Sequence, residues 1–224
     1  MDAVCFDMDG VLVDSEDYWI PYEEADLFPQ LGVDDLDVEE ITGMNYREIY
    51  DYLVETYEVE MARAEFLAWY DEAATTIYGE EVRLLDGADD LLTTLRDRDV
   101  AVALVSSSPH DWIDVVRERF DLEFDAVVSA DAVDGPGKPQ PHVYEYAAAE
   151  LGVDPARAVA VEDSVHGIES ADRAGMYVVG FRHGRADDTD RSRADVVADS
   201  PPDLRASILA RLDADRTDVS DGAA

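Results

Sequence analysis

Short apolar runs of strand length alternate with amphipathic helical segments along most of this chain, and this alternation constrains the fold more than any other feature. The apolar runs are residues 3–6, 100–108, 124–130, 158–164 and 177–181, with 194–198 as a possible edge strand. Periodicity predicts helices at residues 87–98, 111–119, 141–151, 166–174 and 200–212. Continuous apolar strands separated by amphipathic helices predict a parallel sheet with both faces covered.

Residues 15–81, called the helical insert below, interrupt this alternation. Apolar side chains such as Ile49, Leu53 and Phe66 recur there at three- and four-residue steps, which makes one face of each helix apolar. We therefore expect an α/β fold class, with a Rossmann-like parallel sheet core (residues 1–14 and 82–213) that carries helices on both faces and an inserted all-α cap (residues 15–81). The acidic stretch 214–224 is predicted to be a flexible tail.

Polar side chains follow three of the predicted strands at the point where each strand ends, and a lysine precedes the helix at 141–151. In chain order these residues are Asp7, Asp9, Gly10, Ser106, Ser107, Lys138, Glu162 and Asp163. Because ligands of parallel sheets bind beyond the carboxyl ends of the strands, we expect these groups to meet around one cavity.

The composition of the chain weakens the evidence that Asp7 and Asp9 provide by themselves. The chain has 54 acidic and 17 basic residues, and five Asp-x-Asp pairs occur in it, so Asp7 and Asp9 carry weight only in their context. Lysine usage is more specific, because Lys138 is the only lysine among the 17 basic residues. The presence of a single lysine in a chain that otherwise uses arginine suggests that position 138 has a role that arginine cannot fill.

The net charge of −37 also predicts the surroundings of the protein. Such a charge repels itself in dilute buffer, whereas at about 1 M salt the Debye length is only about 3 Å. We therefore expect a salt-rich, halophilic cytoplasm, and neither nucleic acid nor a membrane as partner. The single cysteine, Cys5, can form no disulfide within the chain, which is typical of a reducing compartment.

The residue types at the strand ends indicate a reaction class. Several carboxylates crowded together favour a hard cation such as Mg²⁺, which keeps some of its waters and accepts phosphate oxygens. A hydroxyl with adjacent backbone N–H groups and an ammonium group bind anions. A metal site beside an anion site predicts phosphoryl transfer.

The segments "DMDGVLVDS", "LVSSS", "GKPQPHVY" and "VEDSVHG", in this order, resemble the four motifs of the haloacid dehalogenase superfamily. The helical insert resembles the small helical cap of its phosphoglycolate phosphatase and β-phosphoglucomutase branch. The resemblance implies that Asp7 is the nucleophile that forms an aspartyl phosphate and that Asp9 is the acid and base. It also implies a phosphate site of Gly10, Ser106, Ser107 and Lys138, and an Mg²⁺ site of Asp7, Asp163 and the backbone carbonyl of Asp9, with Glu162 in support.

Several activities of the superfamily fit this sequence less well. Dehalogenases lack the second aspartate, and phosphonate-cleaving relatives use a cap lysine, which the helical insert does not contain. Relatives of the β-phosphoglucomutase type carry a histidine where this chain has Trp19 and an arginine where it has Tyr46. These departures favour a phosphatase, with mutase activity as the alternative and an inactive acidic scaffold as the non-enzymatic one.

The resemblance places substrate choice in the cap loop, and the substrate is expected to be a small sugar or organic-acid phosphate. The candidate specificity residues are Trp19, Thr42, Gly43, Met44, Asn45, Tyr46 and Arg47. Trp19 and Tyr46 serve equally well as core residues of the cap. Arg47 could meet a substrate carboxylate, as in glycolate or glycerate phosphates, or pair with Glu48 or Asp51. The sequence leaves the protein as a monomer or dimer.

Overall fold

The computed structural model describes residues 3–33, 36–182 and 189–221. At its centre lies a six-stranded, all-parallel sheet in the order β3-β2-β1-β4-β5-β6. The strands are β1 (Ala3–Phe6), β2 (Ala101–Ser106), β3 (Ala126–Ser129), β4 (Ala158–Glu162), β5 (Tyr177–Phe181) and the edge strand β6 (Val196–Ala198). The predicted α/β fold is confirmed, and each predicted strand is present.

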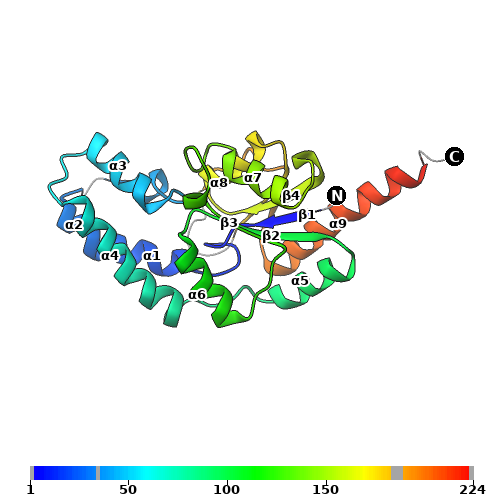
Figure 1. Ribbon diagram of the computed structural model, residues 1–224, viewed down its shortest axis with the longest axis horizontal. Coiled ribbons are helices and arrows are strands. Elements are labelled where there is room, and N and C mark those ends of the chain that lie inside the picture. Colours follow the sequence, from blue (N-terminus) through cyan, green and yellow to red (C-terminus); the bar gives the residue numbers. More distant parts are fainter. Residues whose placement is uncertain (1–2, 34–35, 183–188, 222–224) are drawn as a thin grey trace.

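Helices cover both faces of the sheet (Figure 1). One face carries α7 (His142–Glu150) and α8 (Val165–Arg173), and the other carries α5 (Ala88–Asp97), α6 (His110–Phe120) and α9 (Pro201–Asp221). Short 3₁₀ turns, η4 (Ala130–Ala132) and η5 (Pro155–Arg157), complete the connections. The two cores follow from strand alternation, because Cys5 points into the first layer and Phe6 into the second.

Strand β1 occupies the middle of the sheet and pairs with β2 on one side and β4 on the other. In this register Phe6 lies beside Leu104 and Val161. The next residue of each chain segment is therefore Asp7, Val105 and Glu162. Pairing continues one step further, since the backbone N–H of Asp7 donates to the carbonyl of Val161 at 3.0 Å.

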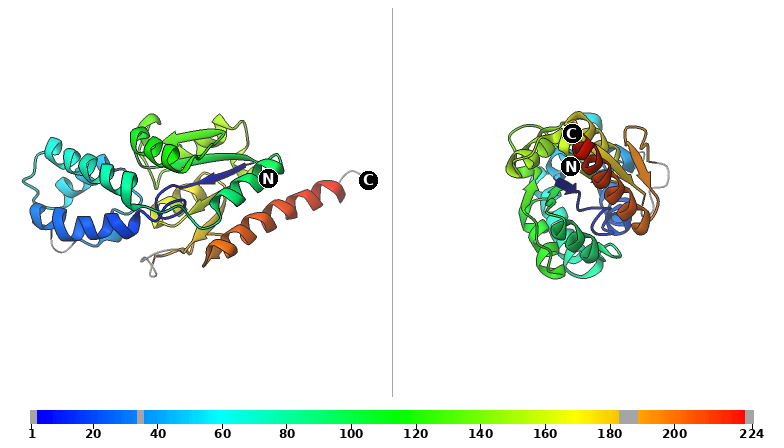
Figure 2. Two further views of the ribbon diagram at one scale, coloured as in Figure 1. Left: turned by 90° about the horizontal axis from the view of Figure 1, so that it is seen from below. Right: turned by 90° about the vertical axis from the view of Figure 1, so that its right-hand side faces the viewer.

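The helical insert extends beyond the carboxyl ends of the strands, on the side of the molecule opposite the two termini (Figures 1 and 2). Its elements are α1 (Glu16–Tyr22), the π-helical η1 (Glu23–Leu27), α2 (Phe28–Leu31), η2 (Val38–Glu40), α3 (Tyr46–Thr56), α4 (Arg63–Thr76) and the π-helical η3 (Ile77–Glu81). Two adjacent chain segments join it to the sheet, where Val13 bridges Leu84 and the N–H of Arg83 donates to Asp14 at 2.6 Å.

Helix α9 differs from the sequence-based expectation at its end. It continues to Asp221, whereas periodicity predicted its end at residue 212, and residues 222–224 lie outside the described part. The reason is local, because the first helix breaker after Pro202 is Gly222. The flexibility expected of residues 214–224 stays a prediction. No helix within the described ranges has the length and apolar character needed to span a membrane.

Candidate active site

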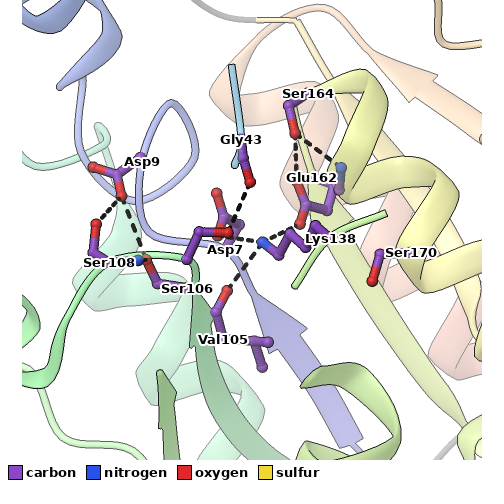
Figure 3. Close-up of polar contacts among 12 residues, drawn as sticks. Asp7, Asp9, Gly43, Val105, Ser106, Ser108, Lys138, Glu162, Ser164 and Ser170 are labelled. Atoms are coloured by element: carbon purple, nitrogen blue, oxygen red, sulfur yellow. Dashed lines mark hydrogen bonds and ion pairs between the residues drawn. The ribbon is translucent and has the colours of Figure 1, made fainter. Parts of the chain in front are cut away.

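Lys138 lies between the carboxylates of Asp7 and Glu162 at the carboxyl edge of the sheet (Figure 3). Its Nζ atom is 2.8 Å from Oδ1 of Asp7, 2.6 Å from Oε1 of Glu162 and 3.4 Å from the carbonyl oxygen of Val105. The residue is 3% exposed. An ammonium group has three donors in a tetrahedral arrangement, and all three have an acceptor here. A planar guanidinium group cannot reproduce this arrangement, which accounts for a lysine and not an arginine at position 138.

The charge of Lys138 is held in place by its partners. Burial alone would lower the pKa of this ammonium group, but the carboxylates of Asp7 and Glu162 outweigh that effect and raise the pKa above its ordinary value. Glu162 also accepts a hydrogen bond from Tyr144 on its Oε1 atom and a longer one from Ser164 on Oε2. Both oxygens of Glu162 therefore have donors already.

Asp163 brings a third buried carboxylate to the same place. Asp7, Glu162 and Asp163 each offer an oxygen within 4.8 Å of the others. Desolvation raises the pKa values of Asp7 and Asp163 well above the ordinary range, and neighbouring carboxylates raise them further. Asp163 accepts no hydrogen bond from any described residue, which is unusual for a buried carboxylate. The donor set therefore fits a hard divalent cation.

Gly10 is required by this arrangement. A Cβ atom at position 10 would lie 1.9 Å from Oδ2 of Asp163, and the backbone has a φ of +70°. The structure thus shows one reason for a glycine at this position, the close approach of the Asp163 carboxylate. The expected approach of a phosphoryl group to Gly10 stays a prediction.

The side chain of Asp9 points away from Lys138 and is surrounded by hydroxyl groups (Figure 3). Its Oδ1 atom accepts from Ser15 and Tyr78, each at 2.6 Å. Its Oδ2 atom accepts from Ser108 at 2.9 Å and from Ser106 at 3.4 Å. The two aspartates thus have different environments, since Asp7 faces an ammonium group and Asp9 faces neutral donors.

The three serines of the loop after β2, residues 106–108, make different contacts. Ser106 is fully buried, and its hydroxyl oxygen accepts from the backbone N–H of Ser108 at 3.0 Å. Ser107 and Ser108 line the cavity, and Ser106 is not among its lining residues. The hydroxyl of Ser107 donates to the carbonyl of Gly43 in the helical insert at 2.7 Å.

The predicted cap loop lies directly on the core. The side-chain amide of Asn45 donates to the carbonyl of Ser107 at 2.7 Å and to Asp131 at 3.0 Å, and Arg47 forms an ion pair with Asp131. The ring of His166 bonds the carbonyl of Thr42 at 2.9 Å. The two partners considered for Arg47 from the sequence are engaged elsewhere, because Glu48 accepts from the N–H of Gly137 and Asp51 pairs with Arg63.

A cavity opens between the sheet edge and the helical insert. It is lined by Asp7, Asp9, Lys138 and Asp163 from the core, and by five of the predicted specificity residues, Trp19, Thr42, Gly43, Met44 and Tyr46. Asn45 and Arg47 do not line it. Trp19 and Tyr46 also pack in the apolar core of the insert, so both interpretations of these residues apply.

Several cavity residues were missed from the sequence, namely Glu16, Glu23, Tyr70, Tyr78, Ser108 and Trp112. Ser108 adjoins a predicted motif. The sequence does indicate an unusual role for Glu23. It lies four residues after Trp19 and four before Leu27, on the apolar face of a helical segment where an acid is unexpected. No sequence pattern indicates the role of Tyr78, since 69 residues separate it from Asp9.

The sequence is similar to those of known proteins. The family described as haloacid dehalogenase-like hydrolase matches residues 4–181. The chain is 35% identical to hexitol phosphatase B of Escherichia coli over 181 residues, which covers 78% of this chain and 80% of that protein. It is 31% identical over 214 residues to the phosphorylated carbohydrates phosphatase of Thermotoga maritima, covering 93% and 98%.

A solved structure gives the same result for the fold. A conserved haloacid dehalogenase-like protein of unknown function from Agrobacterium tumefaciens superposes with a TM-score of 0.73 at 30% identity. The superposition covers 95% of this chain and 99% of that one.

Proposed function

The chain belongs to the haloacid dehalogenase-like hydrolases and is a phosphoric monoester hydrolase, and we propose that it cleaves a small sugar or organic-acid phosphate through an aspartyl phosphate on Asp7. The observation that carries this proposal is the Lys138 ammonium group, buried between Asp7 and Glu162 and open to the cavity. The relatives named above are phosphatases of phosphorylated hexitols and carbohydrates, which supports a small phosphorylated substrate.

In the first step, an oxygen of Asp7 attacks the phosphorus atom and the bond to the leaving oxygen breaks, while Asp9 gives its proton to that oxygen. The products are an alcohol, which departs, and the aspartyl phosphate. Lys138 holds Oδ1 of Asp7 and neutralises charge on the phosphoryl oxygens. In this proposal Ser106, Ser107 and Gly10 also contact the oxygen atoms of the phosphoryl group.

In the second step, Asp9 takes a proton from a water molecule, whose oxygen attacks the phosphorus atom as the bond to Asp7 breaks. Inorganic phosphate leaves, and both aspartates return to their initial states. The four hydroxyl donors around Asp9 fix its carboxyl group at one end of the cavity, where it can serve the leaving oxygen and then the water.

The cofactor in this proposal is Mg²⁺, bound by Asp7, Asp163 and the backbone carbonyl of Asp9. Asp163 supports this assignment best, because it is buried and accepts no hydrogen bond from the described residues. Glu162 has donors on both oxygens and supports Lys138. A bound Mg²⁺ would supply charge neutralisation for the phosphoryl group.

We further propose that the helical insert (residues 15–81) acts as a cap over the core and controls access to the cavity. Trp19 and Tyr46 replace residues typical of β-phosphoglucomutases and favour hydrolysis over isomerisation. The intact set of Asp7, Asp9, Lys138 and Asp163 favours an active enzyme over a scaffold.

A panel of sugar and organic-acid phosphates, assayed for phosphate release with Mg²⁺ in high salt, tests the proposal. We expect release from at least one substrate, lost in Asp7→Asn. Addition of glucose 1,6-bisphosphate to β-glucose 1-phosphate separates the alternatives, because a mutase would form glucose 6-phosphate without net phosphate release. Silence of the folded, Mg²⁺-bound protein across the panel would contradict the proposed function.

A further inference from the structure

Glu23 is a buried carboxylate on the insert side of the cavity that the proposed reaction does not use. It is 7% exposed, and its Oε1 atom accepts a hydrogen bond from the hydroxyl of Tyr70 at 2.6 Å. Its Oε2 atom has no donor among the described residues, although Glu23 lines the cavity. Buried carboxylate oxygens normally have a partner, so this oxygen is available to a ligand.

The cavity offers Glu23 no compensating charge. Lys138 is the only basic side chain among the described residues that line it, and Asp7 and Glu162 already share that ammonium group. Burial raises the pKa of Glu23 to about 7, against the lowering effect of the Tyr70 hydrogen bond. A glutamine could make the same contact with Tyr70 without this cost, so the contact alone does not account for an acid.

Aromatic rings line the same cavity as Glu23. Trp19 stacks on Trp112 at 5.7 Å between centroids and lies 5.3 Å from Tyr70, while Tyr46 lies 4.8 Å from Trp112. All four rings line the cavity. Aromatic surface with a few placed polar acceptors is the usual lining of a small-molecule site. The rings offer apolar contact to the carbon skeleton of a ligand, and Glu23 offers an acceptor to its hydroxyl groups.

We propose that Oε2 of Glu23 accepts a hydrogen bond from a hydroxyl group of a neutral, polyhydroxylated leaving group, so that the site selects sugar and polyol phosphates over carboxylic-acid phosphates. This inference rests on the proposed phosphatase reaction and specifies its substrate. A carboxylated substrate would instead bring its charge next to Glu23 and Glu16, with no unshared cation among the described lining residues.

Arg47 does not change this conclusion. Its guanidinium group pairs with Asp131 and lies over the Tyr46 ring, 4.6 Å from the centroid. Arg47 is also absent from the residues that line the cavity. The site therefore has an acceptor for hydroxyl groups where recognition of a carboxylate would need a donor.

The test compares four substrates: sorbitol 6-phosphate, its carboxylated counterpart 6-phosphogluconate, n-hexyl phosphate, which lacks hydroxyl groups, and p-nitrophenyl phosphate as a general phosphatase substrate. For the wild type we expect kcat/KM on sorbitol 6-phosphate to exceed that on 6-phosphogluconate and on hexyl phosphate by about tenfold or more. In Glu23→Gln the ratio of sorbitol 6-phosphate to hexyl phosphate should fall by about tenfold, and the relative rate on 6-phosphogluconate should rise.

Glu24→Gln is the matched control, because Glu24 is the exposed neighbour of Glu23 in η1, and both ratios should stay at the wild-type values. Tyr70→Phe, which frees Oε1 of Glu23, should lower the sorbitol ratio in the same direction. Unchanged ratios in Glu23→Gln, or a wild type that prefers 6-phosphogluconate, overturn this inference while leaving the phosphatase proposal intact. A folded, Mg²⁺-bound wild type that hydrolyses neither these four substrates nor any member of the sugar and organic-acid phosphate panel overturns the proposed function itself.

Discussion

The hydroxyl oxygen of Tyr78 lies 2.6 Å from Oδ1 of Asp9, and this contact joins the end of the helical insert to the core. Tyr78 accepts a hydrogen bond from the indole nitrogen of Trp19 at 3.1 Å, so its own proton is available to Asp9. Tyr78 is 1% exposed. Ser15 and Tyr78 of the insert thus orient the proposed acid and base directly. Trp19, first considered for substrate choice, also positions Tyr78.

Tyr78→Phe should lower kcat by about tenfold, because Asp9 loses one of its short hydrogen bonds and with it part of its fixed orientation. KM should change little, since Tyr78 is a positioning residue. Steady-state kinetics measures both. Tyr22→Phe, a change at an exposed tyrosine of α1, should leave both constants unchanged. An increase of KM at constant kcat would show that Tyr78 binds substrate instead.

Lys138→Arg should reduce kcat/KM by at least about a hundredfold and destabilise the protein by about 1–3 kcal/mol, although the charge is kept. The larger planar group cannot reach Asp7, Glu162 and the Val105 carbonyl from one buried position. Urea unfolding and phosphate release measure the two effects. The reciprocal control is Arg63→Lys, in an exposed ion pair with Asp51, where the cost should be below about 1 kcal/mol. Full activity of Lys138→Arg would remove our explanation for a lysine at position 138.

Gly10→Ala should abolish Mg²⁺-dependent activity and weaken Mg²⁺ binding, because the new Cβ atom would meet Oδ2 of Asp163 at 1.9 Å. Isothermal titration with Mg²⁺ measures the binding. Gly32→Ala separates the steric effect from backbone strain, since Gly32 has the same φ of +70° but no atom within 4 Å of the place that a Cβ atom would take. That variant should lose about 1 kcal/mol of stability and retain activity. Equal Mg²⁺ affinities of the two variants would disprove a role of Asp163 in metal binding.

Glu23→Gln should become more stable than the wild type as the pH rises. The folded-state pKa of Glu23 is about 7 and its ordinary value is 4.5. Between these pH values the folded protein keeps a proton that the unfolded chain loses, so the wild type loses stability as pH rises through this window, by up to about 3 kcal/mol. The two proteins should be similar below about pH 4.5 and differ most above about pH 7.

Urea unfolding at fixed high salt measures this difference, and Glu24→Gln again serves as the control because the carboxylate that it removes is exposed. Taking the difference between variant and wild type cancels the titration of Asp7 and Asp163, which both proteins share. A difference that does not change between pH 4.5 and 8 would argue against a strained charge at Glu23.

The thermal midpoint should rise with salt concentration, by at least about 5 °C between about 0.01 M and 0.3 M, because the Debye length shortens from about 30 Å toward 10 Å or less. The cause is the net charge of −37, because the charges repel one another more strongly in the compact folded state than in the expanded unfolded state. Sodium chloride and sodium perchlorate should act alike at these concentrations if screening is responsible. A midpoint that rises in chloride and falls in perchlorate would point to a different salt effect.

The sequence by itself determined the sheet and the meeting of its strand-end residues. Apolar runs between amphipathic helices permit a parallel sheet, and parallel strands place their carboxyl ends together, so Asp7, Lys138 and Asp163 could be expected near one another despite their separation along the chain. The end of α9 was misjudged, since an acidic, polar composition does not stop a helix that lacks a breaker.

Only the tertiary structure decided how the helical insert meets that sheet. Periodicity shows which face of a helix is apolar, but it does not show which core residue that face will touch. The contact of Tyr78 with Asp9, the pairing of Arg47 with Asp131 and the placement of Glu23 in the cavity all depend on this docking. Such contacts join residues far apart in the chain, and no local pattern records them.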